Sequence, residues 1–189
     1  MTTKAEEGLI SLGSDRPGQI VQIAFATRDL HGAVLQWLST TRAGPFFLTR
    51  FPLGQQCYRG EFHESAALDI AIGYLGDVMI ELMAPCDDAP SICREMLETR
   101  GEGLHHLMIA CADFDAAVEE YVASGWPVAA YSDMPGYGRS AYIDSVATLG
   151  HFIELVVLTQ QPRNATATMY RAHLTWDGSD PIRDYPQLG

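Results

Sequence analysis

Apolar and polar positions follow the same order twice along this chain. The run at 19–26 is rich in β-branched and apolar residues and predicts a strand, and Asp29 is well placed to cap a following helix. The run at 104–111 and Asp113 repeat this order in the second half. Five apolar residues at helical spacing then continue each copy: Leu30, Ala33, Val34, Trp37 and Leu38 in the first, and Phe114, Ala117, Val118, Tyr121 and Val122 in the second.

The two copies are related by a constant shift. Gln22 and His106 are 84 positions apart (106 − 22), and so are Asp29 and Asp113 (113 − 29). Each copy continues with three predicted strands, and the last strand of each carries a Glu-Leu pair that begins at Glu81 or Glu154. The strands are predicted at 46–49, 68–74 and 78–83, and at 127–131, 140–143 and 151–158. Because such self-similarity indicates a repeated structural unit, we predict an α+β fold built from two fused βαβββ modules.

The predicted division of the chain follows from these modules. It consists of an N-terminal lead-in at 1–18, a first module at 19–90, a connector at 91–103, a second module at 104–160 and a C-terminal extension at 161–189. Within the first module, the stretch 52–65 is expected to be rich in loops. The extension is compatible with a helix around 165–173, followed by an exposed or partner-covering end.

Charge and composition narrow the range of partners. The chain carries 12 basic and 24 acidic residues, a formal net charge of −12, which argues against nucleic acid and against an anionic membrane surface. The N-terminal stretch lacks a basic region followed by an apolar run, so we expect no signal peptide and a cytoplasmic location. The 4 cysteines show no CxxC spacing and are expected to be free thiols.

One polar residue interrupts the inner face of each of four predicted strands. Strand side chains alternate between two faces, and the apolar residues expected under the helices alternate here with Gln22, Glu81, His106 and Glu154. Small neighbours such as Ala24 leave room on this face. Two carboxylates, an imidazole and an amide in a concavity suit a divalent metal ion, which would offset the cost of burying the carboxylates.

Each of these residues also has an ordinary structural interpretation. A single histidine on a strand is usually a hydrogen-bonded core residue, and a glutamate after an apolar run is usually a solvated strand end. The common register of all four across the repeat favours the metal site. By alternation, His105 is expected on the face opposite His106, so the adjacent histidines are not expected to be two ligands.

Asp69, Tyr137 and Arg139 are further candidates, for contacts with a substrate. Asp69 shares the alternation of Ala71 and Gly73 and is interpreted as an additional acid or base on the inner face. Tyr137 and Arg139 belong to a Gly-rich stretch that predicts a flap or hairpin loop. A solvent-exposed position is the alternative interpretation for all three.

The stretches IELMAP, RGEGLHHLMIACADFDAAV and GHFIELV resemble the vicinal oxygen chelate superfamily of glyoxalases, bleomycin-resistance proteins and dioxygenases. The resemblance covers about 19–158 and is strongest to the branch of methylmalonyl-CoA epimerase and glyoxalase I. It implies a cupped, barrel-like mixed sheet with helices on the outside and a divalent metal ion inside. The implied metal ligands are Gln22, Glu81, His106 and Glu154. A homodimer is also implied.

Two departures refine what the resemblance implies. Epimerases usually have histidine where this chain has Gln22, so the ligand set is similar to that of glyoxalase I. Ala26 stands where glyoxalase I has an arginine that holds glutathione, which disfavours glutathione as substrate. Extradiol dioxygenases bind Fe(II) through two histidines and one carboxylate, so Zn, Ni, Co or Mn is favoured over Fe(II) here.

The resulting functional prediction is a metal-dependent isomerase, epimerase or lyase acting on a small-molecule metabolite. A proton next to a carbonyl would move through a metal-stabilised enolate, with Glu154 and Glu81 as the catalytic bases. Two alternatives remain open. One is a non-catalytic small-molecule binding protein of the bleomycin-resistance type, and the other is a metal-dependent lyase or hydrolase acting on a larger apolar metabolite.

Overall fold

The two modules each contribute four strands to one sheet. The computed structural model describes residues 18–53, 55–64, 67–134 and 136–186. The strands of the first module are β1 (Ile20–Ala26), β2 (Phe46–Pro52), β5 (Ala67–Leu75) and β6 (Val78–Pro85). Those of the second are β7 (Gly103–Ile109), β8 (Val128–Met134), β9 (Gly138–Ile143) and β10 (Phe152–Leu158).

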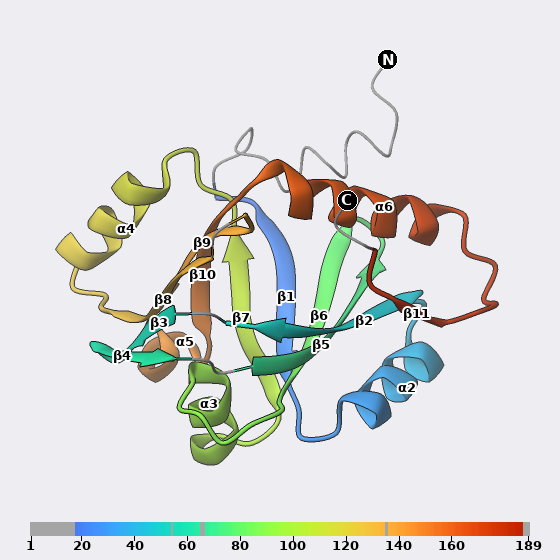
Figure 1. Ribbon diagram of the computed structural model, residues 1–189, viewed down its shortest axis with the longest axis horizontal. Coiled ribbons are helices and arrows are strands. Elements are labelled where there is room, and N and C mark those ends of the chain that lie inside the picture. Colours follow the sequence, from blue (N-terminus) through green and yellow to red (C-terminus); the bar gives the residue numbers. More distant parts are fainter. Residues whose placement is uncertain (1–17, 54, 65–66, 135, 187–189) are drawn as a thin grey trace.

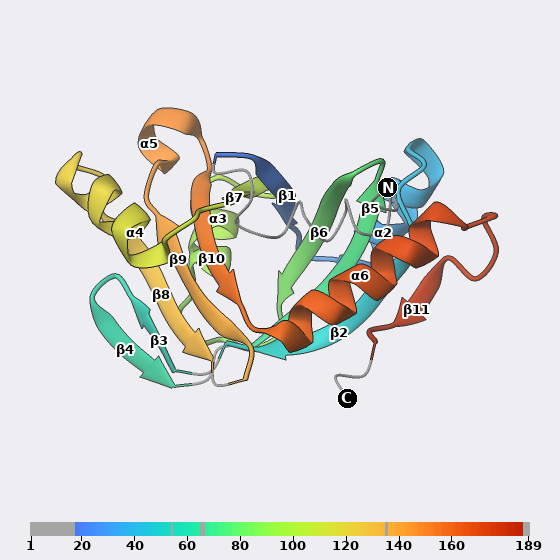
Figure 2. The ribbon, with the colours of Figure 1, turned by 90° about the horizontal axis from the view of Figure 1, so that it is seen from above.

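The two modules join along β1 and β7. These strands pair antiparallel, whereas β1 pairs with β6 and β7 pairs with β10 in parallel. The eight strands therefore run β2-β5-β6-β1-β7-β10-β9-β8, and the last strand of each module lies next to its first. Seen from above, the strands form the two walls of a cup (Figure 2). The prediction of two fused βαβββ modules with a cupped mixed sheet and helices outside it is confirmed.

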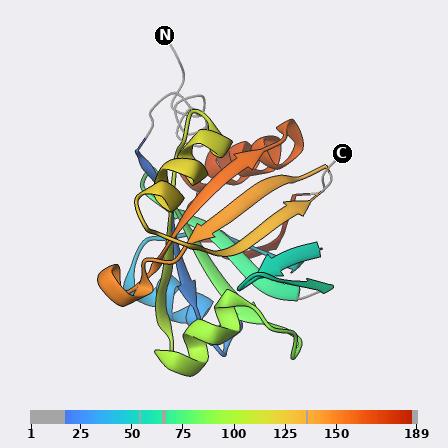
Figure 3. The same ribbon diagram turned by 90° about the vertical axis from the view of Figure 1, so that its left-hand side faces the viewer.

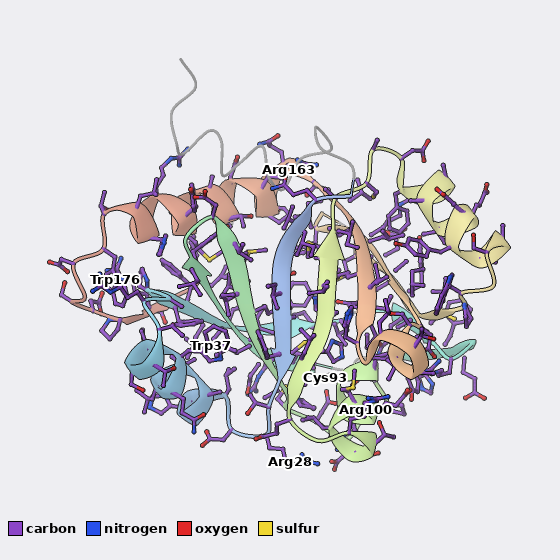
Figure 4. All side chains as sticks on the ribbon, turned by 180° about the vertical axis from the view of Figure 1, so that it is seen from behind. Arg28, Trp37, Cys93, Arg100, Arg163 and Trp176 are labelled. Carbon is purple, nitrogen blue, oxygen red and sulfur yellow. The ribbon has the colours of Figure 1, made fainter. Side chains whose placement is uncertain are left out.

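Two amphipathic helices cover the outer face of the sheet. The helix α2 (Leu30–Thr40) packs on Ile80 and Leu82 of β6, and α4 (Phe114–Ala123) packs on β9 and β10. Asp29 and Asp113 cap them as predicted, each accepting a hydrogen bond from a backbone N–H of the first turn. Trp37 on α2 lies 5.0 Å from the ring of Phe25, between helix and sheet (Figure 4).

The remaining helices lie at the ends of the cup and beside the sheet. They are α3 (Ile92–Thr99), α5 (Val146–Leu149) and α6 (Gln160–Leu174). The helices α6 and α3 lie at opposite ends of the cup (Figures 1 and 3), where Met169 and Cys93 join the inner core. The position of Cys93 on α3 can be followed in Figure 4. Among the described residues, no helix has both the length and the apolar character needed to cross a bilayer.

The stretch 52–65, expected to be rich in loops, contains a β-hairpin instead. Its strands are β3 (Gln55–Tyr58) and β4 (Glu61–Glu64), and β3 pairs with β8 at the far edge of the sheet. Since β2 pairs with β5 of the first module, the consecutive strands β2 and β3 belong to opposite walls of the cup (Figures 1 and 2). The sequence signal was weak because these strands are short and polar, and their pairing partner is distant in sequence.

The C-terminal extension, expected to run out into an exposed or partner-covering end, instead returns to the sheet. After α6, the strand β11 (Ile182–Asp184) pairs in parallel with β2. The backbone N–H of Tyr185 then donates to the carbonyl oxygen of Leu48 at 3.0 Å. The sheet consequently gains β11 at one edge and β3 and β4 at the other, 11 strands in all among the described residues.

The hairpin is tethered to α3 by a charged contact that should give stability a pH dependence. Tyr58 and Arg59 donate to the carboxylate of Glu95 at 2.7 and 3.0 Å. Burial alone would raise the pKa of Glu95, but the hydrogen bonds from Arg59 and Tyr58 hold it below its ordinary value of 4.5. Its stabilisation is therefore present above 4.5 and is lost as the pH falls through the lowered value of the folded state.

We expect Glu95→Gln to lower the free energy of unfolding by about 1–2 kcal/mol at neutral pH, measured by chemical denaturation. In acid well below 4.5 the variant and the wild type should be equally stable. Glu98→Gln, exposed on the same helix, is the matched control and should change little. A difference that persists unchanged in acid would contradict the tether.

Gly138, at the start of β9, is expected to tolerate no side chain. Its φ is +149°, and an added Cβ would overlap the backbone oxygen of Val157 on β10. We expect Gly138→Ala to cost about 3 kcal/mol in thermal or chemical unfolding, because backbone on both strands must shift. Gly136→Ala, with φ +81° and no atom within 4 Å of the added Cβ, should cost roughly 1 kcal/mol. Equal losses for both would show that the contact with β10 does not matter.

Candidate active site

A cavity occupies the concave side of the sheet. Its empty volume is about 730 Å³, and its walls come from both modules, α6 and the C-terminal segment. Most lining side chains are apolar, and six are methionine or phenylalanine: Phe51, Met79, Met83, Met108, Met134 and Met169. The polar groups gather on the central strands, which makes this cavity a typical small-molecule site.

The four predicted metal ligands lie on the four central strands. Gln22 is on β1, Glu81 on β6, His106 on β7 and Glu154 on β10. The atom Nε2 of His106 lies 3.0 Å from Oε2 of Glu154 and 3.7 Å from Oε2 of Glu81. The side-chain exposures are 0% for His106, 7% for Glu154 and 13% for Glu81. Gln22, Glu81 and Glu154 line the cavity, and His106 lies against the two carboxylates.

Burial shapes the charge state of this group. It raises the pKa of Glu81 to about 7, an effect that His106 opposes and Glu154 reinforces. For His106, burial would lower the pKa, but the charges of Glu154 and Glu81 hold it above its ordinary value. The raised pKa of His106 favours its protonated form, which offsets negative charge on the neighbouring carboxylates.

Two buried polar atoms of this group lack a hydrogen-bond partner among the described residues. They are Oε1 of Gln22 and Nε2 of His106, whose 3.0 Å approach to Glu154 is poorly aligned for a hydrogen bond. Such atoms are costly unless something satisfies them. With both carboxylates they form a set of three oxygen ligands and one nitrogen ligand, which fits a divalent metal ion. In the described ranges, no three His, Cys, Asp or Glu side chains lie in an arrangement that could hold a metal ion without adjustment.

Alternation predicted that His105 lies on the face opposite His106, but in the structure the two side chains lie together. Nδ1 of His105 lies 2.9 Å from Nδ1 of His106, and both side chains are fully buried. The ladder between β1 and β7 explains this, because Ala24 and Phe25 pair with His106 and Leu104 and leave His105 as an extra, bulged residue. A bulge interrupts the alternation of side chains on which the prediction relied.

The other β-bulge in this ladder lies at the equivalent place in the first module. Ile20 and Gln22 pair with the adjacent residues Ile109 and Met108, which leaves Val21 as the extra residue. Val21 and His105 are 84 positions apart (105 − 21), the same shift that relates Gln22 to His106. Each bulge therefore directly precedes one of the predicted ligands and helps to set its direction.

The three candidates for substrate contacts occupy different places. Tyr137 lines the cavity, contacts Phe51 with ring centroids 4.8 Å apart, and hydrogen-bonds to Tyr185. Asp69 instead pairs with Arg50 at 2.8 Å and does not line the cavity, so its placement on the inner face is wrong. The strand β5 is apolar on both faces, so its alternation alone could not show which face is inner.

Arg139 also lies away from the cavity. Its guanidinium binds Asp115 at 2.8 and 3.0 Å and stacks over the ring of Phe114, on the outer face beside α4.

Tyr137 is a neutral hydrogen-bond donor on the cavity wall. Its burial raises the pKa of its hydroxyl well above the ordinary value.

Two tyrosines of the site were not predicted. Tyr142 on β9 lies opposite Glu154 in the ladder, and its hydroxyl donates to that carboxylate. Alternation in the predicted strand at 140–143 places Tyr142 with Ser140 and could have indicated it. Tyr185 comes from the C-terminal extension, for which the sequence offered no signal that it enters the cavity.

Comparison with known proteins decides the family. The model of the Glyoxalase/Bleomycin resistance protein/Dioxygenase superfamily matches residues 21–142, about two thirds of the chain. The chain belongs to this superfamily. The match includes the central strands β1, β6 and β7 and agrees with the resemblance seen in the sequence. Curated protein sequences contain no significant match to this member of the superfamily.

Solved structures support the same fold. Methylmalonyl-CoA epimerase from Mycobacterium tuberculosis matches with a TM-score of 0.54 and 20% identity, covering 78% of this chain and 92% of that one. A variant of the Streptomyces coelicolor epimerase in complex with 2-nitronate-propionyl-CoA matches with a TM-score of 0.52 and 20% identity, covering 75% and 97%. A variant of 4-hydroxymandelate synthase from Streptomyces coelicolor matches with a TM-score of 0.53 and 14% identity, covering 82% and 54%. At these identities the likeness shows the fold.

Proposed function

We propose that the cup is the active site of a divalent-metal-dependent enzyme that transfers a proton at a carbon next to a carbonyl of a small molecule. The observation that carries this proposal is the pair of buried carboxylates, Glu81 and Glu154, beside His106 on the floor of an apolar cavity. Membership of a superfamily with glyoxalases, and the likeness in fold to epimerases, support isomerase, epimerase or lyase chemistry. The homodimer implied by the resemblance and the cytoplasmic location expected from the N-terminal sequence remain predictions.

The residues of the site have complementary roles in this proposal. Glu81, a carboxylate on the wall of the cavity, can accept and return a proton. Glu154 receives a hydrogen bond from Tyr142, which fixes its orientation. The apolar walls exclude water from the proton in transit.

Gln22, Glu81, His106 and Glu154 would hold the metal ion, for which Zn, Ni, Co or Mn is favoured over Fe(II). When bound there, a divalent ion supplies Lewis-acid polarisation of a substrate oxygen. The two carboxylates come from different modules and are related by the internal pseudo-symmetry. A base on each side of one carbon is what an epimerising or isomerising reaction needs.

A non-catalytic binding protein of the bleomycin-resistance type is the second candidate. The predominantly apolar lining favours it, since such a cavity suits retention of a ligand as well as turnover. The buried carboxylates, which a purely apolar binding cup would not need, favour the enzyme. A lyase or hydrolase acting on a larger apolar metabolite would use the same metal site.

The first experiment is metal analysis by elemental mass spectrometry on protein purified without a metal-affinity tag, before and after chelation and reloading. We expect about one divalent ion per chain, as one four-ligand site requires. The double variant Glu81→Gln/Glu154→Gln should lose it, and Glu119→Gln, exposed on α4, should retain it. Absence of bound ion in the wild type after reloading would contradict the metal-dependent enzyme and leave the binding protein.

A further inference from the structure

The cavity contains acidic and neutral polar groups but no basic ones. Among its described lining residues, the ionisable side chains are those of Glu81, Glu154 and three tyrosines, and none is Lys or Arg. The arginines nearest the hairpin and the sheet edges are neutralised elsewhere: Arg50 pairs with Asp69, Arg59 with Glu95 and Asp144, and Arg139 with Asp115. With a net charge of −12 on the chain and no Lys or Arg in the described lining, an anionic group away from the proposed metal site would find no partner inside the cup.

A second cavity extends the first toward α3. It has an empty volume of about 340 Å³ and shares Leu68, Met83 and Tyr142 with the first, so the two adjoin. Its walls come from α3, β3 and β8 and include Ile92 and Ala130, with no Lys or Arg among the described lining residues. The hairpin β3–β4 supplies part of one wall through Gln56 of β3.

We infer that the ligand of the cup has an oxygen-bearing head and an uncharged, apolar tail. The head lies at Glu81 and Glu154, and the tail extends past Met83 toward α3. Phosphate or carboxylate groups on the tail, such as the phosphates of a coenzyme A thioester, would have to lie outside the cup. This inference rests on the proposed function only for the position of the head.

The inference can be tested with 1-hydroxy-2-ketones that carry unbranched alkyl tails of increasing length. Titration calorimetry on metal-loaded protein should show affinity rising about fourfold per added methylene until the second cavity is full. The same chains ending in a carboxylate should bind at least about tenfold more weakly, because the buried charge has no partner. Affinity that does not rise with tail length, or carboxylate tails that bind equally well, would overturn the inference.

A variant locates the tail. Ala130 lines only the second cavity, so Ala130→Leu should shorten the tail length at which affinity stops rising. Ala123→Leu, at an exposed position on α4, is the matched control. Should Ala130→Leu fail to fold in thermal melting, the wild-type length series still decides the question. Unchanged length dependence in a folded Ala130→Leu protein would overturn the tail position.

The length series also separates this inference from the proposed function. Plain 2-ketones on metal-free protein measure the tail contribution without any metal ion. A rise in affinity with length in protein that binds no metal would overturn the enzyme but keep the ligand class. Metal binding and proton exchange without any dependence of affinity on tail length would keep the enzyme but overturn the ligand class.

A second inference concerns His105, whose position follows from the bulge in β7. The side chain of His105 is fully buried, packs 5.3 Å from the ring of Phe152 and contacts the Nδ1 of His106 through its own Nδ1. Two nitrogen atoms 2.9 Å apart form a hydrogen bond in which only one of them carries the proton. For Nε2 of His106 to offer a lone pair to a cation, the proton must lie on Nδ1 of His106.

The geometry points to His105 as the positioning residue of His106. Its Nδ1 accepts a hydrogen bond from the Nδ1–H of His106, which fixes the imidazole plane and leaves Nε2 facing the two carboxylates. Its role as acceptor is the same whether Nε2 of His106 binds a proton or a metal ion. The relevance to metal binding rests on the proposed function, but the hydrogen bond itself does not.

His105→Asn and His105→Leu test this role. Asn keeps an acceptor near the position of Nδ1, whereas Leu fills the space without one. Chelator competition with Co²⁺ should show affinity falling about 10–100-fold in the Leu variant and recovering in the Asn variant. In wild-type protein, a scalar coupling through the hydrogen bond between the two Nδ1 nuclei should be visible by ¹⁵N nuclear magnetic resonance.

Two outcomes would overturn the positioning role. One is the absence of that coupling in metal-free and zinc-loaded wild-type protein. The other is a folded Leu variant that binds Co²⁺ as tightly as the wild type. If the coupling is present but the wild type binds no metal, the hydrogen bond stands and the proposed function fails.

Discussion

Glu154→Gln is expected to slow proton transfer by about a hundred- to ten-thousand-fold while leaving the fold intact. The amide has almost the same shape as the carboxylate, and its oxygen can still accept the hydrogen bond from Tyr142. It can no longer take a proton, however. The measurement is solvent deuterium exchange at the carbons next to the carbonyl of a short 1-hydroxy-2-ketone, followed on metal-loaded protein.

Controls in the same assay separate the two carboxylates from nonspecific effects. Glu119→Gln, on the surface of α4, should exchange at the wild-type rate. Glu81→Gln shows whether the second carboxylate is equally required. Melting temperature and metal content, measured on the same samples, report the fold and the site. Exchange at the wild-type rate in metal-loaded Glu154→Gln would exclude Glu154 as an essential base.

His106→Ala is expected to affect both stability and metal binding. Removal of the fully buried imidazole leaves Glu81 and Glu154 close together without the positive charge between them. We expect a loss of about 3–5 kcal/mol in the free energy of unfolding of metal-free protein at neutral pH. Metal affinity should fall at least about a hundredfold, because the nitrogen ligand is lost.

His63 provides the matched control for that variant. It is a partly buried histidine on β4 whose ring lies 5.9 Å from Tyr58, outside the cavity lining. His63→Ala should cost no more than about 1 kcal/mol and should leave metal affinity unchanged. If His106→Ala is as stable as His63→Ala and still binds metal, the charge balance described for the site is incorrect.

The predicted architecture depended on local patterns that burial imposes. Asp29 and Asp113 cap the helices that follow them, and the apolar face of each central strand packs under a helix. Alternation placed Gln22, Glu81 and Glu154 on the cavity side, because a half-buried strand allows polar residues on one face only. The duplicated pattern made it possible to predict two similar modules, since the same packing requirements apply to both copies.

Predictions failed where position depends on pairing with distant residues. Asp69 was placed on the wrong face because β5 is apolar on both sides, and only its neighbours in the sheet show which side is inner. His105 was misplaced because a single extra residue in β7 interrupts alternation. Neither a bulge nor the identity of a strand's neighbours in the sheet can be recognised from the local hydrophobic pattern.

By itself, the sequence determined the two βαβββ modules and the common register of Gln22, Glu81, His106 and Glu154. The reason is that burial of one face imposes a periodic pattern of apolar residues on each strand and helix. Only the tertiary structure decided the shape and charge of the cavity. The hairpin β3–β4 reaches β8 across the cup, and Tyr185 enters the cavity from the C-terminal end. These contacts join segments far apart in the chain, so their energy depends on which surfaces meet after folding rather than on any local repeat.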